Sequence, residues 1–321
     1  MLADLISEKI SNRREKAMKF GVVGVEKRAL KEYLPLYFSM RNSGDFYFSV
    51  QDKKIADVLA NKYRLNHLYQ NLQQLLDLGI DACFIHGTAP SHFELARKCL
   101  QNGVHVFIDR PVGESYTELQ QLQQLALNHR QILMVGFNRR FSPFVEKLKQ
   151  IDHKRLLLVS KNYQDLEMPT NQAINEIFIH LIDTAIFLID EPLKKISSQI
   201  KENNGLLETA VMQLETQQTT AWLAMDCHAG SCNEQIQLTN QAGHYVLDDL
   251  QELSVQKELN KQIRTAKKWA DPAEICGFSQ MVTSFVQAVK LQTSTKLKQK
   301  NILFSHKLCA QMLEQKRTEN K

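Results

Sequence analysis

Three ionisable side chains stand at helical spacing within one apolar stretch of the sequence. Glu176, His180 and Asp183 are four and three residues apart, so a helix over 171–189 would carry them on one face. An imidazole with an ordinary pKa of about 6.5 can exchange a proton at neutral pH, and neighbouring carboxylates can orient the reacting groups. The competing interpretation is that His180 is a hydrogen-bonded core residue, which a single histidine on an apolar helix usually is.

A glycine-containing turn follows the first apolar strand, within residues 18–29. The dinucleotide-binding fingerprint needs a glycine for a tight turn, a glycine where backbone approaches a pyrophosphate, and a small residue where helix packs on strand. These positions hold Gly24, Glu26 and Ala29. The pattern predicts a dinucleotide-binding fold with a carboxylate beside the phosphates. If the Glu26 carboxylate lies about 5 Å from one phosphate charge, their repulsion weakens binding by on the order of 3 kcal/mol at an effective dielectric of about 20. If the carboxylate turns into water, the repulsion falls below about 1 kcal/mol.

Residues near this turn and near the ends of later strands complete the candidate cofactor site, because ligands bind at strand ends in open α/β sheets. Lys27 and Arg28 are expected to offset the charge of Glu26 or of a phosphate. Gln51 and Asp52 are the candidates for contacting a ribose, but they lie farther from the turn than the usual distance of about 20 residues, so NAD and NADP are not distinguished. The candidate set is Gly21, Gly24, Val25, Glu26, Lys27, Arg28, Gln51, Asp52, Gly87, Thr88, Ala89, His92, Asp109, Arg110, Asn138 and Arg139.

Strand and helix patterns alternate through the first part of the chain. Strands are expected over 46–50, 81–86, 104–108 and 132–135, and helices over 56–62, 91–101 and 118–129. This βαβ order predicts a parallel sheet covered by helices on both faces. His92 alternatively caps the helix that begins beside it.

The pattern changes near residue 137. After a helix over 143–150 and the helix that carries His180, alternation predicts antiparallel strands from 195 to about 256, followed by helices over 278–291 and 301–315. The sequence therefore predicts an α/β protein in three parts. These are an N-terminal extension (1–17), a Rossmann dinucleotide-binding domain (18–137) and a C-terminal α/β substrate and oligomerisation domain (138–321).

The composition excludes several classes of protein. The 321 residues are 43% hydrophobic and 23% charged, with a net charge of +5, which is typical of a globular protein. Basic residues are dispersed without interleaved aromatics, so we expect no nucleic-acid partner. We find no export signal and no run of about 18 apolar residues that would span a membrane. Six cysteines without a dense framework predict reduced thiols in the cytoplasm, and we identify no metal site.

Four motifs together resemble the Gfo/Idh/MocA family of oxidoreductases, nearest to its MviM-like branch. They are Gly-Val-Val-Gly-Val-Glu-Lys-Arg-Ala (21–29), Asn-Gly-Val-His-Val-Phe-Ile-Asp-Arg-Pro (102–111), Met-Val-Gly-Phe-Asn-Arg-Arg-Phe (134–141), and His180 with Asp183. The resemblance runs from about residue 18 to the end and is strongest over 80–145. It implies a Rossmann domain, a second domain with a large, open, mostly antiparallel sheet, and NAD(P)-dependent oxidation or reduction of sugars, cyclitols and related hydroxy compounds. It also implies homo-oligomers formed through that sheet.

The resemblance also implies roles for single residues. His180 matches the family's catalytic histidine, which takes the hydroxyl proton while hydride leaves the same carbon. Family members usually have Glu-Lys-Pro where this chain has Asp109-Arg110-Pro111. Arginine keeps its proton, so Arg110 is expected to anchor substrate and nicotinamide, or merely to pair with a carboxylate beside the cleft.

Other positions differ from the family pattern as well. Glu176 stands where an aspartate is usual, and Phe178 where a small residue is usual. Glu176 and Asp183 are expected to act as orienting acids. Because Glu26 and Arg110 both differ at chemically demanding positions, a second interpretation stays open, which is a non-catalytic binding or regulatory protein with the same fold.

Overall fold

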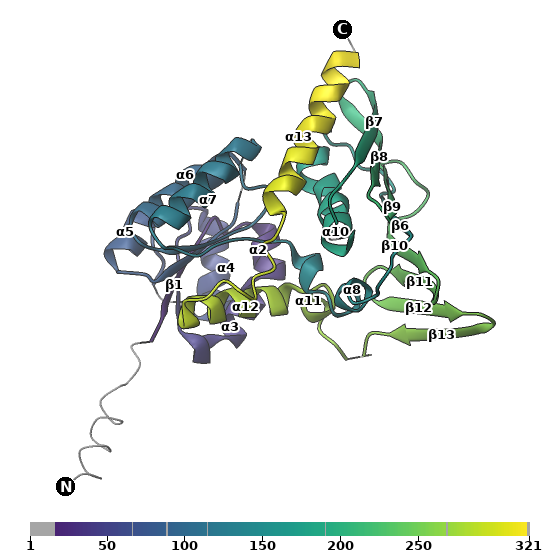
Figure 1. Cartoon of the computed structure of the whole chain (residues 1–321). Helices are drawn as coiled ribbons and strands as arrows, with labels where there is room; N and C mark the ends of the chain where they lie inside the picture. The colour runs from purple at the N-terminus through teal and green to yellow at the C-terminus, as the bar shows by residue number, and fades with distance from the viewer. Residues whose placement is uncertain are drawn as a thin grey trace.

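The structure is a computed structural model that describes residues 17–319, except Asn66, Thr88, Glu114, Asp190 and Lys268. The side chains of Ala89, Pro90 and Glu319 are also not described. The predicted extension 1–17 therefore lies outside the described residues, apart from Ala17. The described chain folds around two sheets (Figure 1).

The first sheet is parallel throughout and has the strand order β2-β1-β3-β4-β5. Its strands are short, and β1, β3 and β4 are almost wholly buried, as expected for a sheet covered by helices on both faces. The strands are β1 (Lys19–Val23), β2 (Asp45–Phe48), β3 (Ala82–Ile85), β4 (His105–Ile108) and β5 (Leu133–Val135). The helices are α2 (Lys27–Glu32), α3 (Leu34–Ser39), η1 (Arg41–Ser43), α4 (Lys53–Tyr63), α5 (Leu72–Asp77), α6 (Ala89–Gln101) and α7 (Tyr116–Asn128).

The second sheet has eight strands in the order β13-β12-β11-β10-β6-β9-β8-β7. Only the β6–β9 pair is parallel, so the sheet is mostly antiparallel, and the predicted fold class is confirmed. The strands are β6 (Leu156–Asn162), β7 (Lys195–Asn203), β8 (Leu206–Glu215), β9 (Thr220–Asp226), β10 (Asn233–Asn240), β11 (Gly243–Asp248), β12 (Glu252–Lys257) and β13 (Asn260–Thr265). The helical elements of this part are η2 (Asn138–Phe141), α8 (Pro143–Lys149), α9 (Thr170–Ala173), η3 (Ile174–Phe178), α10 (Ile179–Ile189), α11 (Pro272–Ile275), α12 (Phe278–Leu291) and α13 (Ile302–Glu319).

One face of the large sheet is covered by helices and the other is open. Figure 1 shows α10 and α13 on the same side of the sheet. Along β9 buried and exposed residues alternate, and Trp222 on the open face is 47% exposed. The stretch Thr170–Ile189 is long and apolar enough to cross a membrane by composition, but 72% of its window is buried inside the protein. It is therefore the core helix of this half.

Helix α12 returns to the first sheet from late in the chain. Phe285 packs against Phe84 and Phe107 at ring-centroid distances of 5.1 and 5.7 Å, and these rings share one buried cluster with Phe20 of β1. Figure 1 shows α12 beside α3, at the N-terminal half of the molecule. The expected division at residue 137 separates the two sheets, but α12 crosses back over it.

Strand β6 and the short helix α2 were not anticipated from the sequence. The chain already forms β6 at Leu156–Asn162, before the helix of His180, whereas strands were expected only from 195. The helix that follows the glycine turn is also short. It ends at Glu32, and α3 starts again with Pro35 in its first turn, where the missing N–H of proline is tolerated.

Candidate active site

A cavity of about 430 Å³ lies where the two halves of the protein meet. His180 of α10 forms part of its wall, together with Arg110, which follows β4. The whole lining is Arg28, Glu32, Arg110, Asn138, Arg139, Lys161, Asn162, Tyr163, Glu176, Ile177, His180, Cys232, Asn233, Glu234, Asp249, Leu250, Cys276 and Phe278. We call it the His180 cavity.

His180 is buried, with 4% of its surface exposed, and neither ring nitrogen has a hydrogen-bond partner among the described residues. The edge of its ring meets Phe137 at a centroid distance of 6.0 Å. Burial lowers the pKa of His180 well below its ordinary value, and the positive charges of Arg110 and Arg139 lower it further. The imidazole is therefore neutral at neutral pH and ready to accept a proton.

Arg110 is held by backbone contacts. Its Nη1 donates to the Glu176 carbonyl at 2.5 Å, and its backbone N–H donates to Oδ1 of Asp109 at 3.0 Å. Burial lowers the pKa of Arg110 to about 10, so it stays a cation at neutral pH. The Nε atom of this guanidinium is buried and has no partner among the described residues.

Asp109 lies behind Arg110, outside the lining of the cavity. The Tyr33 hydroxyl donates to it at 3.2 Å, while Arg28 Nη1 and His86 Nδ1 approach it at 3.9 Å. Burial would raise the pKa of the Asp109 carboxyl, but His86, Arg28 and Arg110 together lower it. Asp109 is therefore a buried anion that stabilises the cations around it.

The opposite wall carries a triad of charges on β6, β10 and η2. Arg139 Nε and Nη2 donate to the two carboxylate oxygens of Glu234 at 2.5 and 2.6 Å, and Lys161 Nζ donates to the same carboxylate at 2.8 Å. Burial raises the pKa of Glu234, but the two cations outweigh it and bring the value to about 2. One carboxylate thus holds two cations, and Asp249, which accepts from the Glu234 backbone N–H at 2.8 Å, adds a second acid to this wall.

Of the two acids expected beside His180, Glu176 lines the cavity and Asp183 does not. Glu176 lines the cavity from the π-helical segment η3, where its Oε1 accepts from Gln172 at 3.0 Å. Asp183 does not line the cavity. It accepts from Arg140 Nε and Nη2 at 2.8 and 2.7 Å and from the Ser305 hydroxyl at 3.0 Å.

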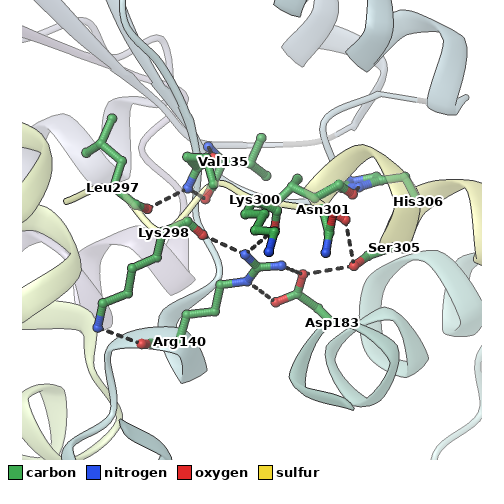
Figure 2. A network of polar contacts seen from close by, with 11 residues as sticks. Val135, Arg140, Asp183, Leu297, Lys298, Lys300, Asn301, Ser305 and His306 are labelled. Atoms are coloured by element: carbon green, nitrogen blue, oxygen red, sulfur yellow. Dashed lines mark hydrogen bonds and ion pairs between the residues drawn. The ribbon is translucent and has the colours of Figure 1, made fainter. Parts of the chain in front are cut away.

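Asp183 is part of a network that joins the two halves of the protein (Figure 2). The Nη1 atom of Arg140 donates to the carbonyls of Lys298 and Lys300 at 2.6 and 2.7 Å. The side-chain amide of Gln299 pairs with the backbone N–H and carbonyl of Val135 on the edge strand β5. The segment before α13 is therefore tied both to the first sheet and to α10, the helix that carries His180.

A second cavity of about 1180 Å³ lies at the carboxyl ends of β1 and β2. Its lining is Val23, Gly24, Val25, Glu26, Lys27, Arg28, Ser49, Val50, Gln51, Asp52, Lys54, Ile55, Asn71, Leu72, Gln73, Gly87, Ser91, Leu95 and Lys98. Arg28 lines both cavities, so they meet at its side chain. We call this one the glycine-turn cavity.

Glu26 and Asp52 differ in how they face this cavity. The Glu26 side chain is exposed and makes no capping hydrogen bond at the start of α2. Its Oε1 lies 3.7 Å from the position that a Cβ on Gly87 would take. Asp52 is engaged as the N-cap of α4, where it accepts from the backbone N–H groups of Lys54 and Ile55. Glu26 can therefore turn into water, whereas Asp52 already has partners.

The Gly24 turn tolerates no side chain. The residue has φ +72°, and a Cβ there would lie 1.8 Å from the carbonyl oxygen of His86. We expect Gly24→Ala to lower the melting temperature and abolish nucleotide binding, because backbone atoms of the turn and of β3 would have to separate. Gly103→Ala is the matched control, since Gly103 has φ +74° with nothing within 4 Å, so it pays only about 1–2 kcal/mol of backbone strain. Equal losses in both variants would contradict this account.

Several predicted residues lie outside both cavities. Gly21 is in the core, where a Cβ would meet the Ile80 and Leu75 side chains. His92 is buried and its Nδ1 lies 2.7 Å from the Pro111 carbonyl, so it supports the loop after β4. Thr88 is not among the described residues, and of Ala89 only the backbone is described, as the first residue of α6.

The sequence analysis missed the charged wall opposite His180. Lys161 and Glu234 are cross-strand neighbours in register on β6 and β10, and β6 was not predicted. The signal was present in Leu-Leu-Leu-Val-Ser-Lys-Asn (156–162), a short apolar run that ends in polar residues.

The two cavities have the geometry that a nicotinamide dinucleotide would need. The bare Gly24 turn opens onto the larger cavity, Arg28 continues into the His180 cavity, and the buried Nε of Arg110 lacks a partner there. Among the residues the structure describes, no group of three or more His, Cys, Asp or Glu side chains could hold a metal ion.

Comparison with known proteins agrees with this geometry. Residues 18–137 match the Gfo/Idh/MocA oxidoreductase family, described by its NAD-binding Rossmann fold. The oxidoreductase YceM of Salmonella typhimurium is 25% identical over 287 residues, which cover 87% of this chain and 91% of YceM. A Gfo/Idh/MocA family oxidoreductase from Vibrio cholerae has a TM-score of 0.84 at 25% identity, covering 93% of this chain and 99% of that one. Residues 18–137 of this chain therefore form a Rossmann domain of the Gfo/Idh/MocA type.

The resemblance in fold extends over both halves of the protein. The dehydrogenase MviM from Clostridium difficile superposes with a TM-score of 0.87 at 21% identity, covering 94% of this chain and all of MviM. The family match and the relatives together support the predicted recognition and the predicted enzyme class, an NAD(P)-dependent oxidoreductase. All six cysteines are free.

Proposed function

We propose that this protein transfers hydride between a nicotinamide cofactor and the hydroxyl-bearing carbon of a sugar, cyclitol or related hydroxy compound. The observation that supports it best is His180, a neutral imidazole with two unpartnered nitrogens in a polar cavity that meets the glycine-turn cavity at Arg28. A proton acceptor beside a cofactor cleft is the arrangement that oxidation of an alcohol requires.

The proposed mechanism uses three side chains of the His180 cavity. His180 accepts the hydroxyl proton as the carbon gives up its hydride, so a carbonyl forms and the imidazole becomes a cation. Arg110 holds a substrate oxygen and the nicotinamide edge, while Glu176 orients a second hydroxyl. Bound nicotinamide supplies the hydride acceptor. Asp183 acts indirectly, as a positioning residue that fixes α10 through Arg140.

Gly24, Val25, Lys27, Arg28 and Gly87 would hold the dinucleotide at the glycine turn, because they line that cavity. The ribose would lie near Gln51 and Asp52, and Asn138 and Arg139 would face the nicotinamide end. Titration of the protein with NADH and with NADPH, followed by nicotinamide fluorescence and heat, tests this assignment. Binding of either at micromolar concentration supports it, and absence of binding of both favours the non-catalytic alternative, a protein that kept the fold as a ligand-binding or regulatory module.

Glu26 is expected to weaken cofactor binding only modestly. Because its carboxylate is exposed, we expect the repulsion to stay below about 1 kcal/mol, which is up to about fivefold in affinity. Glu26→Gln should therefore tighten NADH or NADPH binding severalfold in the same titration, with a larger gain at low salt. Asp57→Asn is the control, since it removes one exposed charge on α4 outside either cavity. Unchanged affinity in Glu26→Gln would show that the carboxylate does not face the phosphates.

We further propose that a second copy of the chain covers the open face of the large sheet, where Trp222 is 47% exposed, and that the protein works in the cytoplasm. Aromatic residues such as tryptophan are enriched at interfaces between subunits relative to the rest of the surface. The free cysteines suit a reducing compartment.

A further inference from the structure

Three arginines near the domain junction differ in what the Nε and Nη2 atoms of their guanidinium groups contact. Arg139 directs its Nε and Nη2 atoms at the carboxylate of Glu234, and Arg140 directs the same two atoms at Asp183. This two-point contact matches the spacing of carboxylate oxygens. Both arginines are thereby neutralised within the protein.

Arg110 does not have such a partner. Among the described residues, its side chain donates only through Nη1, to the backbone carbonyl of Glu176, and its Nε is buried without a hydrogen bond. No carboxylate of the described chain forms an ion pair with it within 4.0 Å, although Glu176 supplies a carbonyl to it. A buried hydrogen-bond donor without a partner is unfavourable, so the Nε atom of Arg110 is expected to receive its acceptor from a bound ligand.

Arg110 belongs to the wall of the His180 cavity. Arg110 and His180 both line it, and the opposite wall holds Arg139 and Lys161 on the carboxylate of Glu234. Cations therefore lie on two sides of His180, while Glu32, Glu176 and Asp249 add acids to the same lining. Beside Arg110, which has no carboxylate partner among the described residues, one negatively charged group would be stabilised, and the size of the cavity, about 430 Å³, suits a small molecule.

We propose that the substrate is a hydroxy acid of the sugar-acid type, whose carboxylate accepts hydrogen bonds from Nε and Nη2 of Arg110. This inference rests on the proposed function and narrows its substrate class. A carboxylate fits better than a phosphate, because Glu32, Glu176 and Asp249 also line the cavity and would repel a doubly charged group more strongly. Arginine in place of lysine here favours a planar two-oxygen acceptor over a neutral hydroxyl.

The test compares ligands that differ only in their anionic group. Glucuronate, galacturonate and gluconate are titrated calorimetrically against glucose, galactose and glucitol, with and without NADH or NADPH, and glucose 6-phosphate is added as a further arm. We expect each acid to bind about 10- to 100-fold more tightly than its neutral partner, as for a hydrogen bond to a charged group. Acids that bind no more tightly than their partners overturn the inference, and so does tighter binding of the phosphate than of glucuronate.

Variants of Arg110 locate the preference. Arg110→Met should abolish it and Arg110→Lys should reduce it, because lysine keeps the charge and loses the planar fork. Arg97→Met, which removes an exposed arginine of α6, is the control and should keep it. A preference for the acids that survives in Arg110→Met overturns the inference. If the methionine variant does not fold, an undiminished preference in Arg110→Lys overturns it. Cofactor titration in the same samples tests the proposed function separately, because acid binding is read without turnover.

Discussion

Replacing His180 with alanine is expected to lower the rate of alcohol oxidation by about 100- to 10,000-fold, the usual contribution of a positioned general base. The variant should still bind NADH or NADPH, because His180 lies outside the glycine-turn cavity. Single-turnover measurement of nicotinamide reduction gives the rate, and direct titration gives the affinity. His129→Ala, at an exposed histidine after α7, is the matched control and should react as the native protein does.

The pH profile is a second measure of the same residue. Burial and the surrounding cations lower the pKa of His180, so the neutral base persists at pH values where an ordinary histidine would be protonated. We expect kcat/KM for oxidation to show no loss from pH 8 down through 6.5, and to fall only in more acidic solution. An unchanged rate in His180→Ala would contradict the assignment of His180 as the base. A fall in the native pH profile at about pH 6.5 that is absent in this variant would contradict the lowered pKa of His180.

Asp183→Asn is expected to destabilise the protein by about 3–5 kcal/mol, because it removes the charge that compensates a buried arginine. The side chains of Arg140 and Asp183 are each 1% exposed, so water cannot replace the lost partner. Urea unfolding followed by tryptophan fluorescence measures the loss. Glu94→Gln, which breaks the exposed pair with Arg97, is the control and should leave the urea unfolding curve nearly unchanged.

The double variant Arg140→Met with Asp183→Leu separates the charge from the packing. Replacing a whole buried pair by apolar residues is often nearly neutral, so we expect it to recover most of the stability. If Asp183 also positions His180, the double variant should fold and yet show a lower kcat with little change in KM. A loss below about 1 kcal/mol in Asp183→Asn would show that the pair contributes little.

Periodicity was sufficient to predict most of the secondary structure. The helix expected over 278–291 coincides with α12, and the strand expected over 104–108 differs by one residue from β4. Strand β6 was missed because it is isolated in sequence between two helices, with its pairing partners β9 and β10 more than 50 residues later. The π-helical turn of η3 depends on tertiary contacts, such as the Arg110 hydrogen bond to Glu176, that have no period in the sequence.

The site was predictable where a motif fixes a residue at the end of a strand or on one helix face. Arg110, Glu176 and His180 line one cavity, and Gly24 forms the turn of the other, while the roles assigned to them stay predictions. Asp183 was expected to be an orienting acid from helical spacing alone, but three residues along a helix turn the side chain by about 60° from the His180 direction. The structure shows that it points to Arg140 instead. Spacing cannot reveal such a partner 43 residues away.

Helix α12 has a consequence for how the protein is made. The rings of Phe84 and Phe107 on the first sheet are covered by Phe285, which the ribosome adds about 180 residues later. The nucleotide-binding half is therefore first to be synthesised and among the last parts to be completed. Until residues 278–291 emerge, this aromatic surface is available to chaperones, and a fragment that stops at residue 137 would expose it permanently.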